Sequence, residues 1–157
     1  MRIWRFAAGL AAGLLLAAPA MAEVDLTAVK TCVAQRAEAG TSTECVSLSH
    51  TECRAFPEDA PAAATLCFKQ AHDRWSEGIA ARMTEIRAAV EDPLAAAAGI
   101  DVKYDLLTSL LQCDRMEEMA LLSDGPTEQI LLQKTRCSAL ASGYVYVRLL
   151  LRSRNLP

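Results

Sequence analysis

Apolar residues recur at helical spacing through most of the chain, and the clearest run lies between about Ala62 and Glu91. The apolar positions there follow one another at spacings of 7, 4, 4, 3 and 4 residues: Phe68, Trp75, Ile79, Met83, Ile86 and Val90. Charged side chains lie largely off this stripe, which predicts an amphipathic helix. Pro61 suits its first turn, and Asp92-Pro93 ends or kinks it. We expect Trp75 to be a core residue of this helix rather than an exposed anchor for a partner.

Two shorter helices are predicted before this one. Residues 25–39 have apolar positions at helical spacing, and Gly40 supplies a C-terminal stop. A polar joint follows at residues 41–44, and a second helix then carries Cys45 and Leu48 and extends toward Cys53. The prolines and acids of residues 57–61 form a loop that separates this helix from the long one.

Two more helices are predicted over residues 101–122 and 127–152, joined by a turn at residues 123–126. Asp101 is a good N-cap for the first of them, and residues 94–98, closed by Gly99, add a separate turn before it. Its apolar side is formed by Val102, Leu106, Leu110, Cys113 and Met116, and is widened by Leu107 and Leu111. The other helix has a near-heptad stripe: Ile130, Cys137, Leu140, Tyr144, Val147 and Leu151. The pattern as a whole predicts an all-α chain of about five helices.

The six cysteines fit a set of disulfide-clipped helical hairpins. Cys113 and Cys137 each lie twelve residues from Gly125 and fall on facing stripes, so a hairpin brings their sulfurs together. Closing this loop stabilises the fold by roughly 3–4 kcal/mol in the chain-entropy model.

The other two pairs follow from the same kind of spacing. Cys53 and Cys67 each lie seven residues from the middle of the proline-rich loop, and Cys32 and Cys45 flank the joint at residues 41–44. A bond between Cys45 and Cys53 within one helix is excluded, because eight residues of helix span roughly 12 Å. We therefore expect Cys32–Cys45, Cys53–Cys67 and Cys113–Cys137.

The first 22 residues have the three parts of a secretory signal peptide. Residues 1–5 are cationic, residues 6–19 are apolar, and Ala20-Met21-Ala22 is a cleavage site. The apolar run is shorter than the ~20 residues that a membrane span needs, so we expect no stable membrane insertion after cleavage. Residues 23–157 then form a single domain in the periplasm or outside the cell, where an even number of cysteines is typically oxidised.

Charge separates this predicted domain into two parts. Residues 23–134 contain 19 acids and 10 basic residues, a net charge of −9, and residues 135–157 contain four arginines and no acid. Nucleic acid is a poor partner for such a body, because phosphate binding needs a basic face. A cationic protein suits it better, although a solvated acidic surface that keeps the protein soluble explains the same charge.

Candidate catalytic and metal-binding groups are few. The two histidines, His50 and His72, have no zinc-like ligand set around them, and oxidised cysteines cannot supply thiolates. The C-x-x-C redox motif, the C-x-x-C-H haem motif and the G-x-S-x-G nucleophile motif are all absent from the sequence. We therefore expect no enzyme activity, no cofactor and no bound metal.

The segment from Cys67 to Met83 resembles the central helix of the lysozyme inhibitor LprI-like family of small secreted bacterial proteins. Cys45, Cys53, Cys67 and Trp75 have counterparts in the variant of that family with an extra upstream cysteine pair, and Cys113, Gly125 and Cys137 match its later pair and glycine loop. The chain departs from the family at Ile79-Ala80, where the family has Leu-Asn, and at Met83, where it has an aromatic residue.

The resemblance implies a disulfide-stabilised helical protein that binds a partner, and for some members inhibition of lysozyme. We expect a periplasmic or secreted protein that masks a cationic enzyme such as lysozyme. The alternative is an envelope structural or stress-related protein with another protein partner and no catalysis. The acidic edge of the last hairpin is the predicted partner-binding surface: Asp114, Glu117, Glu118 and Asp124.

Overall fold

The computed structural model describes residues 23–156, and the predicted signal peptide lies outside these residues. Within them the chain is all-α, with six helices and no strand, which confirms the predicted fold class. The helices are α1 (Leu26–Arg36), α2 (Glu44–Ser49), α3 (Thr51–Arg54), α4 (Pro61–Ala89), α5 (Asp92–Leu121) and α6 (Thr127–Arg152).

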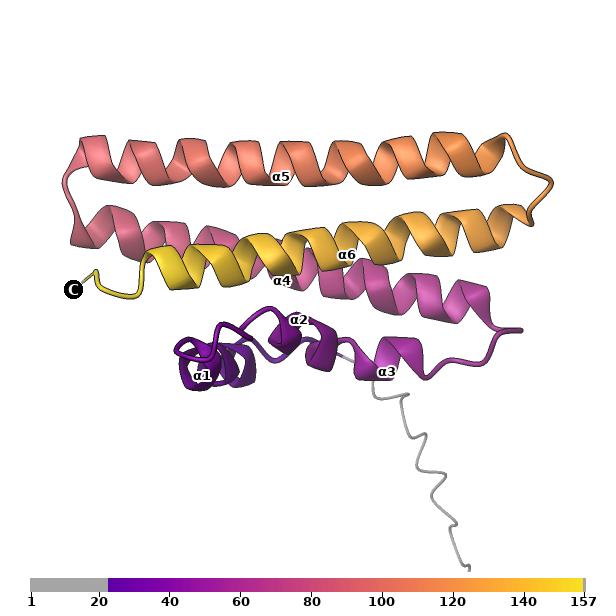
Figure 1. Cartoon of the computed structure of the whole chain (residues 1–157), viewed down its shortest axis with the longest axis horizontal. Coiled ribbons are helices and arrows are strands. Elements are labelled where there is room, and N and C mark those ends of the chain that lie inside the picture. Colours follow the sequence, from indigo (N-terminus) through magenta and orange to yellow (C-terminus); the bar gives the residue numbers. More distant parts are fainter. Residues whose placement is uncertain (1–22, 157) are drawn as a thin grey trace, which may run out of the picture.

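Three long helices, α4, α5 and α6, run antiparallel to their neighbours in sequence and form the body of the molecule (Figure 1). The central helix is α6, which packs against α4, α5, α1 and α2. The short helices α1–α3 form a layer on the far side of the molecule from α5 (Figure 1). Among the described elements α5 packs only against α6 and α4, so it is an edge helix.

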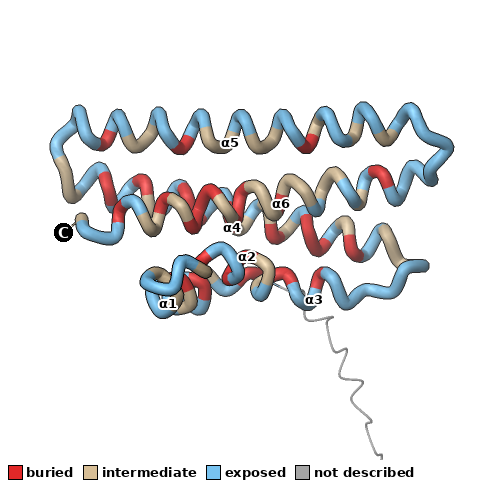
Figure 2. The backbone as a smooth tube through the Cα atoms, in the orientation of Figure 1, coloured by how far each residue is buried: buried red, intermediate tan, exposed pale blue. Residues whose placement is uncertain are grey.

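The core lies where α4 and α6 meet the short helices. Trp75 and Ile86 of α4 and Tyr146 of α6 are among the largest fully buried side chains, which confirms the predicted stripe of α4. Figure 2 shows buried residues concentrated along α4 and α6, whereas α5 is mostly exposed or half-buried. Gly143 allows the closest approach between helices, because a Cβ there would lie 2.6 Å from Val46 Cγ1 of α2.

The predicted separate turn at residues 94–98 and the helix start at Asp101 are wrong, because α5 is one helix from Asp92 onward. Pro93 occupies the first turn of the helix, where a proline starts a helix instead of ending it. The alanines that follow have the highest helix propensity, which offsets the cost of about 1 kcal/mol for Gly99. Asp101 therefore lies inside the helix and caps nothing.

The helix predicted to extend from Cys45 toward Cys53 is interrupted at His50. Helix α2 ends at Ser49, α3 begins at Thr51, and His50 has the non-helical angles φ −102° and ψ 11°. This break turns the imidazole of His50 into the core, where its side chain is 1% exposed.

Three disulfides join helices that are neighbours in sequence, and they are the pairs that the spacing predicts. Cys32–Cys45 joins α1 to the start of α2, Cys53–Cys67 joins α3 to α4, and Cys113–Cys137 joins α5 to α6. The Cα atoms of the three pairs are 6.0, 5.5 and 5.7 Å apart. These three pairs of helices are therefore each held by a covalent bond, whereas no disulfide joins α4 to α5.

Candidate functional site

A groove of about 660 Å³ runs along α5 and α6 over the Cys113–Cys137 disulfide. Its walls come from two stretches of antiparallel helix: Thr108, Ser109, Gln112, Cys113 and Met116 from α5, and Gln133, Arg136, Cys137, Leu140, Ala141 and Tyr144 from α6. The other sides of α6 are covered by α4, α5 and the short helices. The groove is therefore the side of the central helix that no other described element covers.

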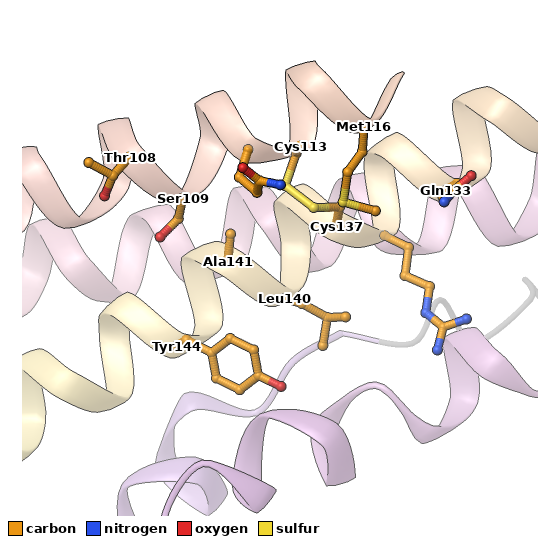
Figure 3. A pocket seen from close by; sticks show the side chains of 11 residues that line it. Thr108, Ser109, Cys113, Met116, Gln133, Cys137, Leu140, Ala141 and Tyr144 are labelled. Carbon is orange, nitrogen blue, oxygen red and sulfur yellow. A yellow bond between two sulfur atoms is a disulfide. The ribbon is translucent and has the colours of Figure 1, made fainter. Parts of the chain in front are cut away.

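The floor of this groove is apolar and its border is polar. Figure 3 shows the disulfide beside Met116, with Leu140 and Tyr144 further along α6. Amides and hydroxyls lie among them, and Arg136 is the one charged side chain among the lining residues of this groove. Such a lining suits an apolar side chain or segment of a partner, because polar groups at the border fix its orientation.

At one end the groove leads to the two loops that close the hairpins. The α3–α4 loop and the α5–α6 loop lie at the same end of the molecule (Figure 1). The side-chain amide of Gln129, in the first turn of α6, donates to the backbone oxygen of Glu58 at 3.5 Å, which links the two loops.

This end carries a group of acidic side chains that we call the acidic end: Glu58, Asp59, Glu118, Asp124 and Glu128. All five are exposed, and within the described part of the chain none of them forms an ion pair. Large apolar side chains are exposed among them: Phe56, Met119, Leu121, Leu122 and Leu131. Leu122 is 90% exposed.

The four residues of the predicted acidic edge fall into two pairs: two are in ion pairs with Lys134 and two are not. Asp114 and Glu117 both contact the ammonium group of Lys134 on α6, Asp114 at 2.8 Å. The hydrogen bonds that Lys134 donates to these two carboxylates raise its pKa, so it stays charged and neutralises them. Glu118 and Asp124 point to solvent at the acidic end, so only these two of the four predicted residues remain available as free charges.

Glu58, Asp59 and Glu128 were not predicted as site residues, although the order of the helices contains a signal for them. Three long antiparallel helices alternate in direction. The start of the first and the turn between the second and third therefore fall at the same end. Combined with the acids of the two loops and of the helix ends beside them, this rule would place the five carboxylates together.

His50 has a buried partner that the sequence does not reveal. The indole Nε1 of Trp75 donates to His50 Nε2 at 2.9 Å, and the rings of Phe68 and Trp75 pack edge-on against the imidazole. Burial, followed by the charges of Arg54 and Arg136, lowers the pKa of His50 to about 4. The imidazole is therefore neutral at pH 7 and serves as a hydrogen-bond acceptor in the core.

His72 lies elsewhere, on the surface of α4, with Nδ1 3.5 Å from a carboxylate oxygen of Asp73. Asp73 also accepts a hydrogen bond from Lys69, and this bond is the main reason why the pKa of Asp73 is lowered. All six cysteines are in disulfides, and among residues 23–156 no group of three or more His, Cys, Asp or Glu side chains is placed to hold a metal ion.

None of the helices formed by the described residues is both long enough and apolar enough to cross a membrane. No protein-family model, no curated protein and no solved structure matches the chain. The resemblance to the LprI-like family therefore rests on the cysteine framework and Trp75.

Proposed function

We propose that this chain is a binding protein of the periplasm or the extracellular space, without catalytic activity, and that it binds a cationic protein through the acidic end. One observation carries the proposal. Two hairpin loops and the adjoining ends of α5 and α6 place five unpaired carboxylates around exposed apolar side chains at one end of the molecule.

The three disulfides support an extracytoplasmic location. Disulfides persist in oxidising compartments and are rare in the reducing cytosol. Here all three join neighbouring helices within a chain of small size, which is the usual way in which exported domains are stabilised.

Long-range attraction supports a basic partner. The chain has 16 Lys and Arg, of which Arg2 and Arg5 lie in the predicted signal peptide, so residues 23–157 have 14 against 19 acids and a net charge of −5. The acidic end concentrates five carboxylates that form no ion pair among the described residues, although Arg54 and Arg136 line the same cavity as Glu58. Complementary charge of this kind speeds the encounter of two proteins and orients them, and salt weakens it.

Short-range contact requires apolar surface as well. Interfaces combine an apolar centre with a polar border, and a few buried large side chains supply most of the affinity. Leu122 and Met119 at the tip of the last hairpin are such side chains, and the adjoining groove offers an apolar floor for a side chain of the partner.

Lysozyme is the specific partner that we propose, because it is a cationic enzyme and because some members of the LprI-like family inhibit it. The protein would then mask the enzyme by binding to its basic surface. Of the four residues predicted to bind the partner, Glu118 and Asp124 keep this role. Asp114 and Glu117 are replaced in it by three other residues of the acidic end: Glu58, Asp59 and Glu128.

The test is a lysozyme activity titration with the purified, oxidised chain from residue 23 onward. We expect inhibition at low salt that weakens as salt is added. A variant with four charges removed from the acidic end (E58Q/D59N/D124N/E128Q) should inhibit at least tenfold less. A matched variant with four charges removed from other exposed positions (E38Q/E91Q/D92N/D101N) has the same net charge and should inhibit nearly as well as the wild type.

Equal weakening in both variants would show that overall charge alone acts, and would refute the acidic end as the interface. If lysozyme activity is unchanged at low salt and a large excess of the protein, lysozyme is not the partner. The alternative of another protein partner in the envelope then takes its place.

A further inference from the structure

Helix α5 has two apolar faces, and the structure covers only one of them. The inner face, with Ala95, Val102 and Cys113, is buried against the bundle. The outer face has a second stripe, formed by Ile100, Tyr104, Leu107 and Leu111, whose side chains are 55%, 60%, 48% and 44% exposed. At about 100° per residue the two stripes point roughly 160° apart.

The outer stripe has the spacing of a helix-pairing seam. Its residues are separated by 4, 3 and 4 positions, which is the a/d pattern that packs one helix against another. The stripe lies on the edge helix, and no described element contacts α5 other than α6 and α4 (Figure 1). A second helix can therefore approach it without moving any part of the bundle.

We propose that α5 is a homodimer interface, in which the outer stripe packs antiparallel against the same stripe of a second copy. A twofold axis then passes between Asp105 and Leu106. Each residue of α5 faces the residue of the second copy that lies equally far from this axis, so the numbers of two facing residues add up to 211. Tyr104 faces Leu107 of the second copy, and Ile100 faces its Leu111. Each contact occurs twice, so all eight apolar side chains are paired.

Charge placement favours the antiparallel direction. The next two positions of the same repeat are Asp114 and Glu118. Asp114 is neutralised by Lys134, but a parallel pair would place Glu118 opposite Glu118 of the second copy, which is unfavourable. In the antiparallel pair Asp114 faces Ala97 of the second copy and Glu118 faces its Pro93, so neither acid lies opposite its own counterpart.

The size of the stripe is sufficient for a reversible dimer. Its four side chains expose roughly 400 Å² per copy, within the range of the largest apolar patches on soluble proteins, which are often functional. Both copies together with the flanking residues bury on the order of 1,000 Å², at the lower end of specific interfaces. We therefore expect a dimer that dissociates on dilution.

The first test is sedimentation velocity of the oxidised chain over a wide concentration series. The wild type should shift from monomer to dimer as concentration rises. Leu107→Glu should remain monomeric throughout. Leu66→Glu is the matched control, since Leu66 of α4 is 49% exposed and lies outside the stripe, and it should dimerise like the wild type. A wild type that stays monomeric, or a Leu107→Glu variant that still dimerises, overturns the proposal.

The second test determines the direction of pairing and guards against a misfolded variant. Tyr104→Lys and Leu107→Glu, each alone, should abolish the dimer. The double variant Y104K/L107E should restore it, because the antiparallel register sets the new opposite charges against each other twice. A parallel pair would instead set like charges together. A double variant that stays monomeric overturns the antiparallel register.

Discussion

Acid should destabilise the fold through the buried imidazole of His50. Its pKa is about 4 in the folded protein, against an ordinary value of 6.5, chiefly because burial disfavours the charged ring. Between these two pH values the unfolded chain binds a proton that the folded chain does not. The free energy of unfolding therefore falls as the pH is lowered from 6.5, and at pH 4 the loss reaches about 3 kcal/mol.

Urea unfolding at a series of pH values from 7 to 4 measures this loss. Trp75 is the only tryptophan of residues 23–157, and it contacts His50 directly, so its fluorescence reports the transition. His50→Gln removes the titrating ring and keeps an acceptor for the indole N–H. The wild type should lose about 3 kcal/mol more than this variant between pH 7 and pH 4.

The comparison isolates His50, because acids such as Asp73 and Glu85, whose pKa values are lowered by hydrogen bonds from Lys69 and Arg82, contribute equally to both proteins. If His50→Gln and the wild type lose the same free energy, or if NMR titration gives His50 an ordinary pKa, this reasoning is refuted.

Further substitutions test the packing at two glycines and the contribution of a disulfide. Gly143→Ala should lower the free energy of unfolding by about 1–3 kcal/mol, because the added methyl group would lie 2.6 Å from Val46 Cγ1. Gly99→Ala should raise the free energy of unfolding by up to about 1 kcal/mol, because its methyl group would meet its nearest neighbour at 3.7 Å. Urea unfolding that shows a lower stability for both variants would contradict this account. Replacing both Cys113 and Cys137 by Ala opens a loop with a sequence separation of 24 and should cost about 3–4 kcal/mol, measured by thermal unfolding, and an unchanged melting temperature would contradict it.

Local features were predictable from the sequence because neighbouring residues determine them. The turn at residues 123–126 and the positions of Cys113 and Cys137 are enough to define the last hairpin and its disulfide. The stripe that includes Trp75 was enough to place α4 in the core. In each case the pattern lies within one helix or one hairpin, so no long-range contact had to be known.

Contacts between distant segments could not be predicted from the sequence. The hydrogen bond between Trp75 and His50 joins residues 25 positions apart, and nothing in the pattern indicates that the helix breaks at His50 to make it. Helix α5 shows the other limit. The sequence predicts that Leu107 and Leu111 widen the buried face of α5. The rest of the molecule packs against only one side of this helix, and these two residues lie on the other side, exposed to solvent. Periodicity identifies an apolar face and does not say what covers it.

Binding of a cationic protein by the acidic end is tested most directly by an NMR titration of the ¹⁵N-labelled, oxidised chain with lysozyme at low salt. We predict that the shifted amides lie in the α3–α4 loop, the α5–α6 loop and the adjoining end of the groove. Shifts centred on the opposite end, at the junction of α4 and α5, or the absence of any shift at a saturating excess of lysozyme, would contradict it.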